Sequence, residues 1–271
     1  MAETLEVRLH RLRDVIAGYG SAVVAFSGGV DSALVAYIAH DVLGAGRALA
    51  ATAVSPSLAE TELQDCQTQA DSWGMEWKGV MTDELSRPEY VANGADRCYH
   101  CKSELMDGLG KLAADRGATI LLGVNLDDLG DHRPGQQAAK EQGAQFPLVD
   151  AGFTKADVRA AARLLGLEVW DKPAAACLAS RVPYGTPVEL GTLRQVADAE
   201  AGLKALGFTQ LRVRHYGDLA RVELPVEQLP EAVTQREALI EAVRSAGYRY
   251  VTLDLEGFRS GNLNAALSPD K

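Results

Sequence analysis

The sequence predicts an α/β fold with a parallel sheet covered by helices on both faces, followed by a smaller C-terminal α+β domain. Over roughly two thirds of the chain, apolar strand-like runs alternate with helical runs, which is typical of such sheets. After the Pro- and Gly-containing segment 181–188, half-exposed alternating runs replace them. The 271 residues, 47% of them hydrophobic, suffice for two domains. We therefore expect one domain over 1–186 and a second over 187–271.

Each element of the first domain is predicted by its spacing of apolar residues. Leu5, Leu9, Leu12 and Ile16 recur with helical spacing, and Gly44 and Gly74 end the next two helical runs. Strands are expected where the chain is continuously apolar. In chain order, helices are expected over 5–16, 32–44, 58–74, 104–118 and 155–167, and strands over 22–27, 48–55, 76–82, 119–125 and 168–172.

The second domain reads differently. Alternating runs over 211–217 and 220–225 predict two antiparallel strands, and 249–255 predicts a third strand. Helices are expected over 189–208 and 230–248. This mixture indicates an α+β domain.

Charge and hydropathy exclude some function classes. The formal net charge is −10, which argues against a general nucleic-acid binder, because such proteins cluster Lys and Arg. No apolar run reaches the roughly 18 residues of a membrane-spanning helix, and the N-terminus has no signal-peptide core. We therefore expect a cytoplasmic protein that binds neither nucleic acid nor membrane.

A glycine-rich turn between the first strand and the next helix predicts an anion site. Backbone N–H groups at a helix N-terminus attract phosphate, and glycines allow close approach. Asp31 would repel a phosphate unless a cation lies between them, so it indicates Mg²⁺. Neither a Walker P-loop nor a dinucleotide fingerprint is present. The candidate phosphate-binding residues are Ser27, Gly28, Gly29, Val30, Asp31 and Ser32.

The stretch "AFSGGVDS" resembles the pyrophosphate-binding loop of the PP-loop ATP pyrophosphatases, whose fold is adenine nucleotide alpha-hydrolase-like. That superfamily cleaves ATP between the α and β phosphates. The segment "LLGVNLDDLGDHRPG" is similar to a later strand end that helps to hold Mg²⁺, which implies a role for Asp128, with Asp131 and Arg133 in support. The resemblance also implies that ATP contacts Gly123, and that Ala53 and Ser55 line the adenine site.

Three of the four cysteines are candidates for metal or redox chemistry. Cys98 and Cys101 form a C-x-x-C, which alone fits zinc, a redox disulfide or an iron–sulfur site. Cys177 follows 76 residues after Cys101, in a segment of small residues. Cys66 lies on a predicted helix and is interpreted as an ordinary buried cysteine.

Seven stretches, taken together, resemble the LarE family over about residues 5–265. They are "VAFSGGVDSALV", "RCYHCK", "GDHRPG", "TKADVRAAARLLGL", "CLASRVPYGTPV", "LRVRHYGDLARVELP" and "YVTLDLEGFRSG". The resemblance implies an ATP-dependent sulfur transferase acting on pyridinium-3,5-biscarboxylate mononucleotide. Its carboxylates would be adenylated and converted to thiocarboxylates, as a step towards the nickel-pincer nucleotide of lactate racemase.

The family has two sulfur sources. One subgroup sacrifices the sulfur of the cysteine that corresponds to Cys177, and another holds a 4Fe–4S cluster on three cysteines. Cys98, Cys101 and Cys177 place this sequence in the cluster group by resemblance. A zinc site that adds His100 is the main structural alternative, although four protein ligands would close it.

Arginines in the second domain predict a pocket for the substrate phosphate. Arg212 and Arg214 share one face of a strand, and Arg259 follows the last strand. Glu200 and Glu223 are candidate cation or arginine partners. The catalytic candidates are Cys177, Asp31, Ser180 and Arg181, the last two contacting the adenylate. Lys102 and Lys155 are candidates for offsetting the charge of pyrophosphate, but surface lysines are the favoured interpretation of both.

Three rival classes share the PP-loop resemblance: tRNA thiolases, amide-forming ligases and non-catalytic nucleotide sensors. The acidic charge argues against the first, and the three cysteines argue against the other two. The expected partners are ATP, the nucleotide substrate and a sulfur donor that the sequence does not identify. We also expect a homo-oligomer.

Overall fold

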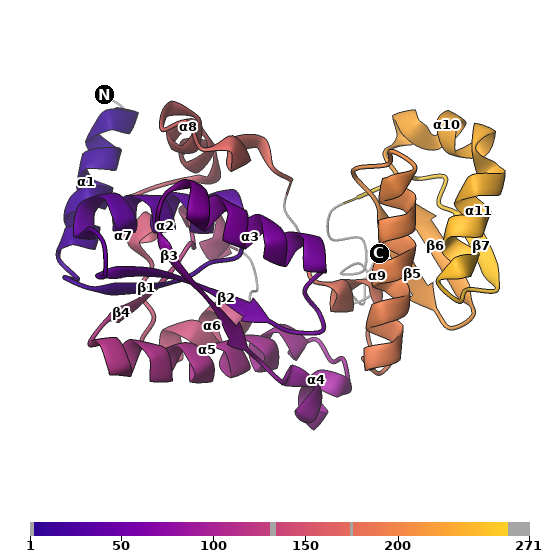
Figure 1. Cartoon of the computed structure of the whole chain (residues 1–271), viewed down its shortest axis with the longest axis horizontal. Coiled ribbons are helices and arrows are strands. Elements are labelled where there is room, and N and C mark those ends of the chain that lie inside the picture. The colour runs from indigo at the N-terminus through magenta and orange to yellow at the C-terminus, as the bar shows by residue number, and fades with distance from the viewer. Residues whose placement is uncertain (1–2, 131–133, 174–175, 260–271) are drawn as a thin grey trace. The chain divides into compact units, whose positions relative to one another are not determined.

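The computed structural model describes residues 3–130, 134–173 and 176–259, which divide into two compact units (Figure 1). Unit 1 comprises residues 1–84 and 98–175, and unit 2 comprises 85–97 and 176–271. Two segments of the expected first domain, 85–97 and 176–186, therefore make their contacts with the C-terminal unit. The chain leaves unit 1 after its third strand and returns to it at Cys98.

Unit 1 is built on a four-stranded parallel sheet of order β3-β2-β1-β4. The strands are β1 (Ala22–Ala25), β2 (Ala48–Val54), β3 (Glu76–Met81) and β4 (Thr119–Leu122). The helices are α1 (Leu5–Ala17), α2 (Val30–Leu43), α3 (Glu60–Ser72), α5 (Arg97–Arg116), α6 (Pro134–Glu141), α7 (Pro147–Asp150) and α8 (Lys155–Leu164). Short 3₁₀ turns are η1 (Glu84–Ser86), η2 (Leu126–Gly130) and η3 (Glu168–Asp171).

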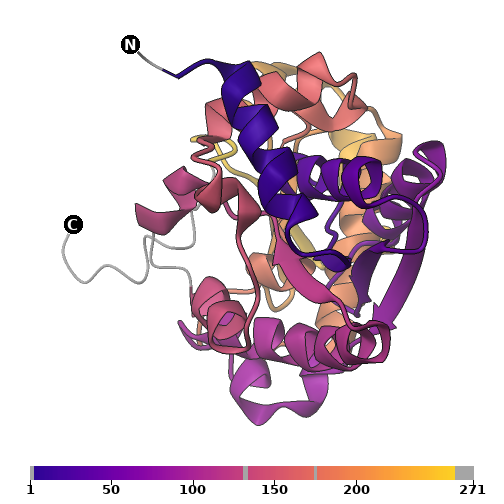
Figure 2. The same cartoon turned by 90° about the vertical axis from the view of Figure 1, so that its left-hand side faces the viewer.

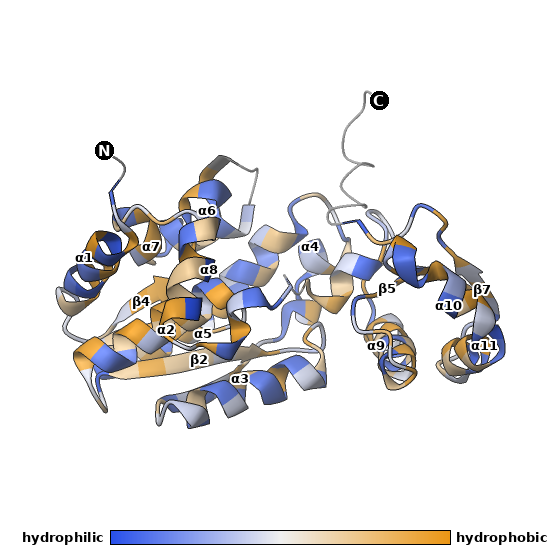
Figure 3. Cartoon of the chain, turned by 90° about the horizontal axis from the view of Figure 1, so that it is seen from above, coloured by the Kyte–Doolittle hydropathy of each residue, from blue (hydrophilic) through white to orange (hydrophobic). Residues whose placement is uncertain are grey.

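Helices cover both faces of this sheet, as the apolar strands predict (Figure 2). Successive residues of β1 point to opposite sides: Ala22 and Val24 pack with α1, α2, α3 and α8, whereas Val23 packs with α5 and α6. Helix α2 is mostly orange in Figure 3 because its residues are largely apolar, and most of them are buried. The α/β prediction is confirmed. In the described ranges, no helix has the length and apolar character that a membrane crossing needs.

One predicted strand of unit 1 is wrong. Residues 168–172 form the 3₁₀ turn η3 rather than a strand. Val169 is buried, and the Lys172 ammonium binds Glu62 at 2.9 Å and Asp65 at 2.8 Å, both on α3. The segment is thus anchored by side chains, and two apolar residues in five were too few to specify a strand.

Unit 2 has a three-stranded sheet of order β5-β6-β7, in which β5 and β6 are antiparallel, as predicted, and β6 and β7 are parallel. The strands are β5 (Arg212–Tyr216), β6 (Leu219–Glu223) and β7 (Tyr250–Leu253). Its helices are α4 (Pro88–Val91), α9 (Leu190–Ala205), α10 (Leu229–Thr234) and α11 (Arg236–Ser245), with the turns η4 (Leu178–Arg181) and η5 (Val226–Gln228). The single helix expected over 230–248 divides at Gln235, whose ψ of 18° is not helical.

Apolar side chains of α9 and α11 form the core of unit 2 with the strands β5 and β6. Leu203 of α9 and Val243 of α11 pack in one cluster with Val213 and Val222 of the sheet. Unit 2 therefore has a hydrophobic core of its own. The segment 85–97 joins it through backbone hydrogen bonds, such as that from the Val188 N–H to the Val91 carbonyl, at 2.9 Å.

Candidate functional site

The glycine-rich turn between β1 and α2 is braced by its own serines. Gly28 has a φ of +68°, which glycine adopts without strain. The hydroxyls of Ser27 and Ser32 lie 3.1 Å apart, and Ser32 Oγ donates to the Gly29 carbonyl at 3.0 Å. Helix α2 begins at Val30 without a side-chain cap, so the N–H groups of its first turn remain available to a ligand. The turn therefore presents backbone donors at the N-terminus of α2.

Helix α3 supports the turn from behind. A Cβ atom on Gly28 would lie 2.9 Å from the Cys66 Sγ, and Gln69 Nε2 donates to the Gly28 carbonyl at 3.3 Å. Cys66 is fully buried, and burial raises the pKa of its thiol to about 11. Cys66 is therefore a buried packing residue, as expected.

The end of β4 approaches the same turn so closely that only glycine fits there. A Cβ atom on Gly123 would lie 2.6 Å from the carbonyl carbon of Asp31 and 2.6 Å from the Ser32 nitrogen. Because those atoms belong to the backbone of α2, they cannot yield as the end of a flexible side chain could. Gly123 thus sets the approach of β4 to the N-terminus of α2.

Asn125 connects the two acidic residues that the sequence assigns to Mg²⁺. It is 1% exposed; its Nδ2 donates to Asp31 Oδ1 at 2.9 Å, and its backbone N–H donates to Asp128 Oδ2 at 3.1 Å. Asp31 therefore accepts from the side-chain amide of Asn125, and Asp128 accepts from its backbone N–H. Asp127 orients the side-chain amide by donating its backbone N–H to Asn125 Oδ1 at 3.0 Å. Asp131 and Arg133 lie outside the described residues.

Lys155 completes this group, and its side chain is 37% exposed. Its ammonium forms an ion pair with Asp31 Oδ2, and its backbone N–H donates to Asp127 Oδ2 at 2.8 Å. Lys155 holds the first position of α8, where Thr154 and Asp157 form a capping box. Lys102 is half-buried in α5, where burial lowers the pKa of its ammonium.

A shallow cavity of about 450 Å³ lies where β2 and β3 end. Ser55 lines it, and Ala53 precedes the lining residue Val54 in β2. Ser55 Oγ lies 2.9 Å from Ser57 Oγ, which donates to the buried Glu84 at 2.7 Å. This chain of hydrogen bonds fixes the loop after β2, at the edge of the sheet where open α/β folds bind ligands.

The three candidate cluster cysteines differ from Cys66 in exposure. Cys98 and Cys177 are exposed and Cys101 is partly exposed, and none of the four cysteines forms a disulfide. Cys98 and Cys101 are three residues apart in α5, so they share one face of that helix. Among the described residues, no group of three His, Cys, Asp or Glu is close enough to hold a metal ion. Cys98 and Cys101 belong to unit 1, whereas Cys177 belongs to unit 2.

Two of the expected substrate-site arginines are held by buried carboxylates in unit 2. Arg181 binds Glu200 through Nε and Nη2, both at 2.8 Å, and Arg214 binds Glu223 through Nε at 3.0 Å and Nη2 at 2.7 Å. Glu200 and Glu223 are thus arginine partners, as expected. Ser180 Oγ lies 3.0 Å from Arg181 Nη1, beside Cys177. These contacts fix both guanidinium groups.

Arg212 and Arg259 belong to the same unit and are more exposed than Arg181 and Arg214. Arg212 is half-buried with its guanidinium 5.1 Å from the centre of the Phe258 ring, and Arg259 is exposed and pairs with Glu256. Burial, followed by the positive charge of Arg181, lowers the pKa of Arg212.

Sequence reasoning missed two residues of this architecture. Asn125 ends a buried apolar run at the carboxyl end of a strand, a position that could have flagged it. Arg97 carried no such signal: its guanidinium is buried and donates to the Ala179 carbonyl at 2.9 Å, across 82 residues of sequence.

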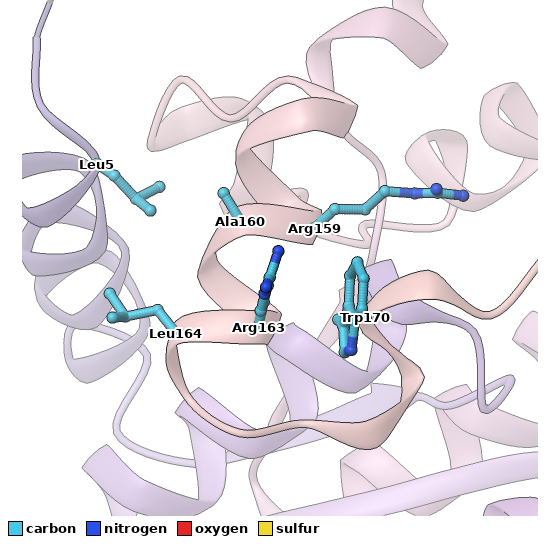
Figure 4. A pocket seen from close by; sticks show the side chains of 6 residues that line it. All are labelled: Leu5, Arg159, Ala160, Arg163, Leu164 and Trp170. Carbon is cyan, nitrogen blue, oxygen red and sulfur yellow. The ribbon is translucent and has the colours of Figure 1, made fainter.

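Another cavity, of about 640 Å³, contains none of the predicted site residues (Figure 4). It lies between α1, α8 and η3, where the Arg163 guanidinium stacks 5.0 Å from the centre of the Trp170 ring. Its other lining residues are Leu5, Arg159, Ala160 and Leu164. It therefore has cations and an apolar floor but no acid, base or nucleophile.

Comparisons with known proteins place these features in context. The sequence profile of the NAD synthase family matches residues 5–93. The chain is 40% identical to the pyridinium-3,5-bisthiocarboxylic acid mononucleotide synthase of Lactiplantibacillus plantarum, over 90% of this chain and 89% of that protein. It is 48% identical to an uncharacterized protein of Synechocystis, over 97% and 99% of the two chains. An uncharacterized protein of Methanocaldococcus jannaschii is 26% identical, over 88% and 90%.

Proposed function

The chain belongs to the LarE family, that of the pyridinium-3,5-bisthiocarboxylic acid mononucleotide synthases, and we propose that it is an ATP-dependent sulfur transferase of that specificity. Its substrate is pyridinium-3,5-biscarboxylate mononucleotide, whose carboxylates become thiocarboxylates on the route to the nickel-pincer nucleotide. ATP is cleaved to AMP and pyrophosphate. The rival readings as a tRNA thiolase or an amide-forming ligase are not favoured.

The observation that carries this proposal is the group of polar residues beside the glycine-rich turn. The uncapped N-terminus of α2 supplies donors for phosphate, and Asn125 holds Asp31 and Asp128 next to it. Backbone donors and carboxylates at one place suit a phosphate chain that arrives with a divalent cation. ATP·Mg²⁺ has both parts, whereas a free anion would meet the charge of Asp31.

Asp31 and Asp128 are the proposed Mg²⁺ ligands. Mg²⁺ commonly takes one or two carboxylates and fills its remaining positions with water and substrate phosphates. Two carboxylates beside the turn fit that donor set, and a dedicated cage of three acidic side chains is not needed. When bound, the ion offsets the charge that develops as pyrophosphate leaves.

Lys155 changes partner when ATP binds. Without a nucleotide, its ammonium neutralises Asp31, with which it forms an ion pair. If Asp31 held a cation, the Lys155 ammonium would be released to pair with the phosphates of ATP. The donors of the turn and Lys155 thereby hold the pyrophosphate, while a carboxylate oxygen of the substrate attacks the α-phosphorus. No general base is required, because a carboxylate is already the nucleophile.

Unit 2 holds the nucleotide substrate in this proposal. Arg212 and Arg259 bind its phosphate, since both guanidinium groups retain exposed surface. Arg214, which the sequence also assigns to the phosphate, is buried and paired with Glu223. Arg181 and Arg214 keep Ser180 in place through hydrogen bonds to its hydroxyl and its carbonyl. A sulfur nucleophile then attacks the acyl carbon of the adenylate, and AMP leaves.

Cys98, Cys101 and Cys177 are proposed to hold a 4Fe–4S cluster. Their thiols fit the donor chemistry, because all three have exposed surface and none is in a disulfide. When bound, a cluster with three protein thiolates leaves one iron open to carry the sulfide for transfer. The sacrificial route, in which Cys177 loses its own sulfur, remains the rival source.

An Asp31→Ala variant tests the nucleotide site. It removes a proposed Mg²⁺ ligand, so AMP and pyrophosphate formation should fall by at least 100-fold, while the folded structure is retained. Asp41→Ala is the matched control, because Asp41 lies at the other end of α2 and pairs with Arg13 at the surface. Release of ADP and orthophosphate by the unaltered protein would contradict the proposal.

Iron content tests the sulfur source. Protein reconstituted without oxygen should hold about four irons, and alanine at any of the three positions should remove most of them. Cys66→Ala is the matched control, because Cys66 is buried against the turn of unit 1. Dehydroalanine at position 177 in active, iron-free protein would instead establish the sacrificial route.

A further inference from the structure

Three arginines from separate segments hold the backbone around Cys177. Arg181 Nη1 donates to the Ala176 carbonyl at 2.6 Å and to the Cys177 carbonyl at 2.9 Å. Arg214 Nη1 donates to the Ser180 carbonyl at 2.8 Å, and Arg97 Nη1 donates to the Ala179 carbonyl at 2.9 Å. We use "Cys177 loop" for residues 176–181. Its carbonyl groups thus bind guanidinium groups, and such charge-assisted hydrogen bonds are the strong ones.

Each guanidinium also binds a side chain, and Arg97 does so through the same Nη1 that donates to the Ala179 carbonyl. Glu200 anchors Arg181 and Glu223 anchors Arg214, whereas Asn93 Oδ1 accepts from Arg97 Nη1 at 2.6 Å. Arg97 is 5% exposed, so this bond forms away from water. A hydrogen bond that is shielded from water holds its geometry better than an exposed one.

Asn93 makes hydrogen bonds to the following segment through both its side chain and its backbone. It is fully buried with a φ of +55°, a left-handed conformation that asparagine tolerates better than most residues. Its Nδ2 donates to the carbonyls of Pro183 and Thr186, both at 2.8 Å, and its own carbonyl accepts from the Gly185 N–H at 3.0 Å. Asn93 therefore ties Arg97 to the segment that follows the Cys177 loop.

Arg97 is also the residue that precedes Cys98 and begins α5. One side chain therefore fixes the Cys177 loop, and its own backbone leads directly into the C-x-x-C segment. We propose that Arg97, held by Asn93, is a positioning residue that fixes the Cys177 loop for sulfur transfer. The proposal rests on the proposed function, in which Cys177 serves as a ligand or sulfur source.

Backbone hydrogen exchange tests this directly in the apo protein. In Arg97→Gln, the amides of Ser180 and Val182, which close the turn η4, should exchange on the order of tenfold faster, because the loop loses a charge-assisted bond. Arg97→Lys keeps a donor and the charge and should restore part of the protection. Arg249→Gln, at an exposed arginine of the same unit, is the matched control and should change nothing.

A second variant separates Asn93 from Arg97. Asn93→Gly removes the amide while keeping a residue suited to positive φ, so it should loosen the loop to a similar extent. If Arg97 and Asn93 act as one unit, the amides of the Cys177 loop should exchange in the double variant at about the rate seen in either single variant. Full addition of the two effects would overturn the coupling of Arg97 to Asn93.

The rate of iron loss from the reconstituted protein is a measurement that a purely structural role of Arg97 would not change. Arg97→Gln should lose iron on the order of tenfold faster than the unaltered protein, with an altered electron paramagnetic resonance signal, while the strands of unit 2 keep their protection from exchange. Unchanged exchange in the Cys177 loop, or faster exchange throughout unit 2, would overturn the positioning role. If the unaltered protein holds no iron, the cluster proposal fails, yet the exchange experiment still decides the role of Arg97.

Discussion

The ion pair beside the glycine-rich turn of unit 1 differs in exposure from the ion pairs beside the Cys177 loop of unit 2. In unit 1, the Lys155–Asp31 pair retains exposure, at 37% and 19% of the two side chains. In unit 2, the Arg181–Glu200 pair is 5% and 7% exposed, and the Arg214–Glu223 pair 6% and 0%. A partly exposed pair contributes little to stability, whereas breaking a buried pair leaves a charge without compensation. The Lys155–Asp31 pair is thus accessible to solvent, whereas the two buried pairs of unit 2 hold the Cys177 loop.

The largest expected effect follows from breaking a buried pair. Glu223→Gln removes the negative charge between Arg214 and Arg221, so the free energy of unfolding should fall by about 3–5 kcal/mol. Urea denaturation, followed by a probe in unit 2, measures it. Glu256→Gln breaks an exposed pair with Arg259 and should cost less than about 1 kcal/mol. Equal losses in the two variants would contradict the contrast between buried and exposed pairs.

The next effect concerns the close approach of β4 to α2. Gly123→Ala places a methyl group 2.6 Å from backbone atoms of Asp31 and Ser32, which should cost about 1–3 kcal/mol and reduce ATP cleavage. Gly110→Ala, within α5, meets nothing within 4 Å and should be neutral or stabilising. Thermal melting and pyrophosphate release report the two effects. Full activity of Gly123→Ala would show that ATP cleavage does not depend on the close approach of β4 to α2.

Lys155→Ala should separate stability from function. Its ion pair with Asp31 is partly exposed, so the loss of stability should stay below about 1 kcal/mol. ATP affinity should nevertheless fall, since the variant lacks a proposed phosphate ligand. Calorimetric titration with a non-hydrolysable ATP analogue and Mg²⁺ measures this. Undiminished affinity would restore the interpretation of Lys155 as a surface lysine.

The smallest effect is a pH dependence of unit 2. Burial lowers the pKa of His215 below its usual 6.5, and its Nδ1 lies 3.1 Å from the Tyr248 hydroxyl. His215 therefore binds a proton more readily in the unfolded chain than in the folded one. Its neutral side chain contributes to stability at higher pH, and this contribution declines as the pH falls through about 6.5. Unfolding between pH 7.5 and 5.5 measures it. The decline should be shallower in His215→Gln, and parallel curves for the two proteins would show that His215 is not its source.

The sequence predicted those parts of the molecule that depend on local pattern. Apolar runs predicted β1 to β4, and the glycine-rich turn was recognised because Gly28 and Gly29 stand between a strand and a helix. The strand predicted over 168–172 was wrong, because the position of this segment depends on the ion pairs of Lys172 with α3. The pattern of apolar residues cannot reveal such contacts. Local pattern is thus reliable where the backbone itself makes the contacts.

Long-range side-chain contacts could not be predicted in the same way. The Arg97 bond to Ala179 spans 82 residues, and the Lys155 pair with Asp31 spans 124. Neither pairing follows from periodicity or spacing. Glu223 was a candidate arginine partner, but that it binds Arg214 in particular became evident only in the fold. The sequence therefore predicted which residues matter better than it predicted what they contact.

The central claim is that a substrate carboxylate attacks the α-phosphorus of ATP and that sulfur then displaces AMP. Substrate labelled with ¹⁸O in its carboxylates tests this most directly. The oxygen that bridges carbon and phosphorus in the adenylate stays with phosphorus when sulfur attacks the acyl carbon. The account predicts one ¹⁸O in each AMP and a thiocarboxylate product. Unlabelled AMP, or ADP with orthophosphate, would contradict it.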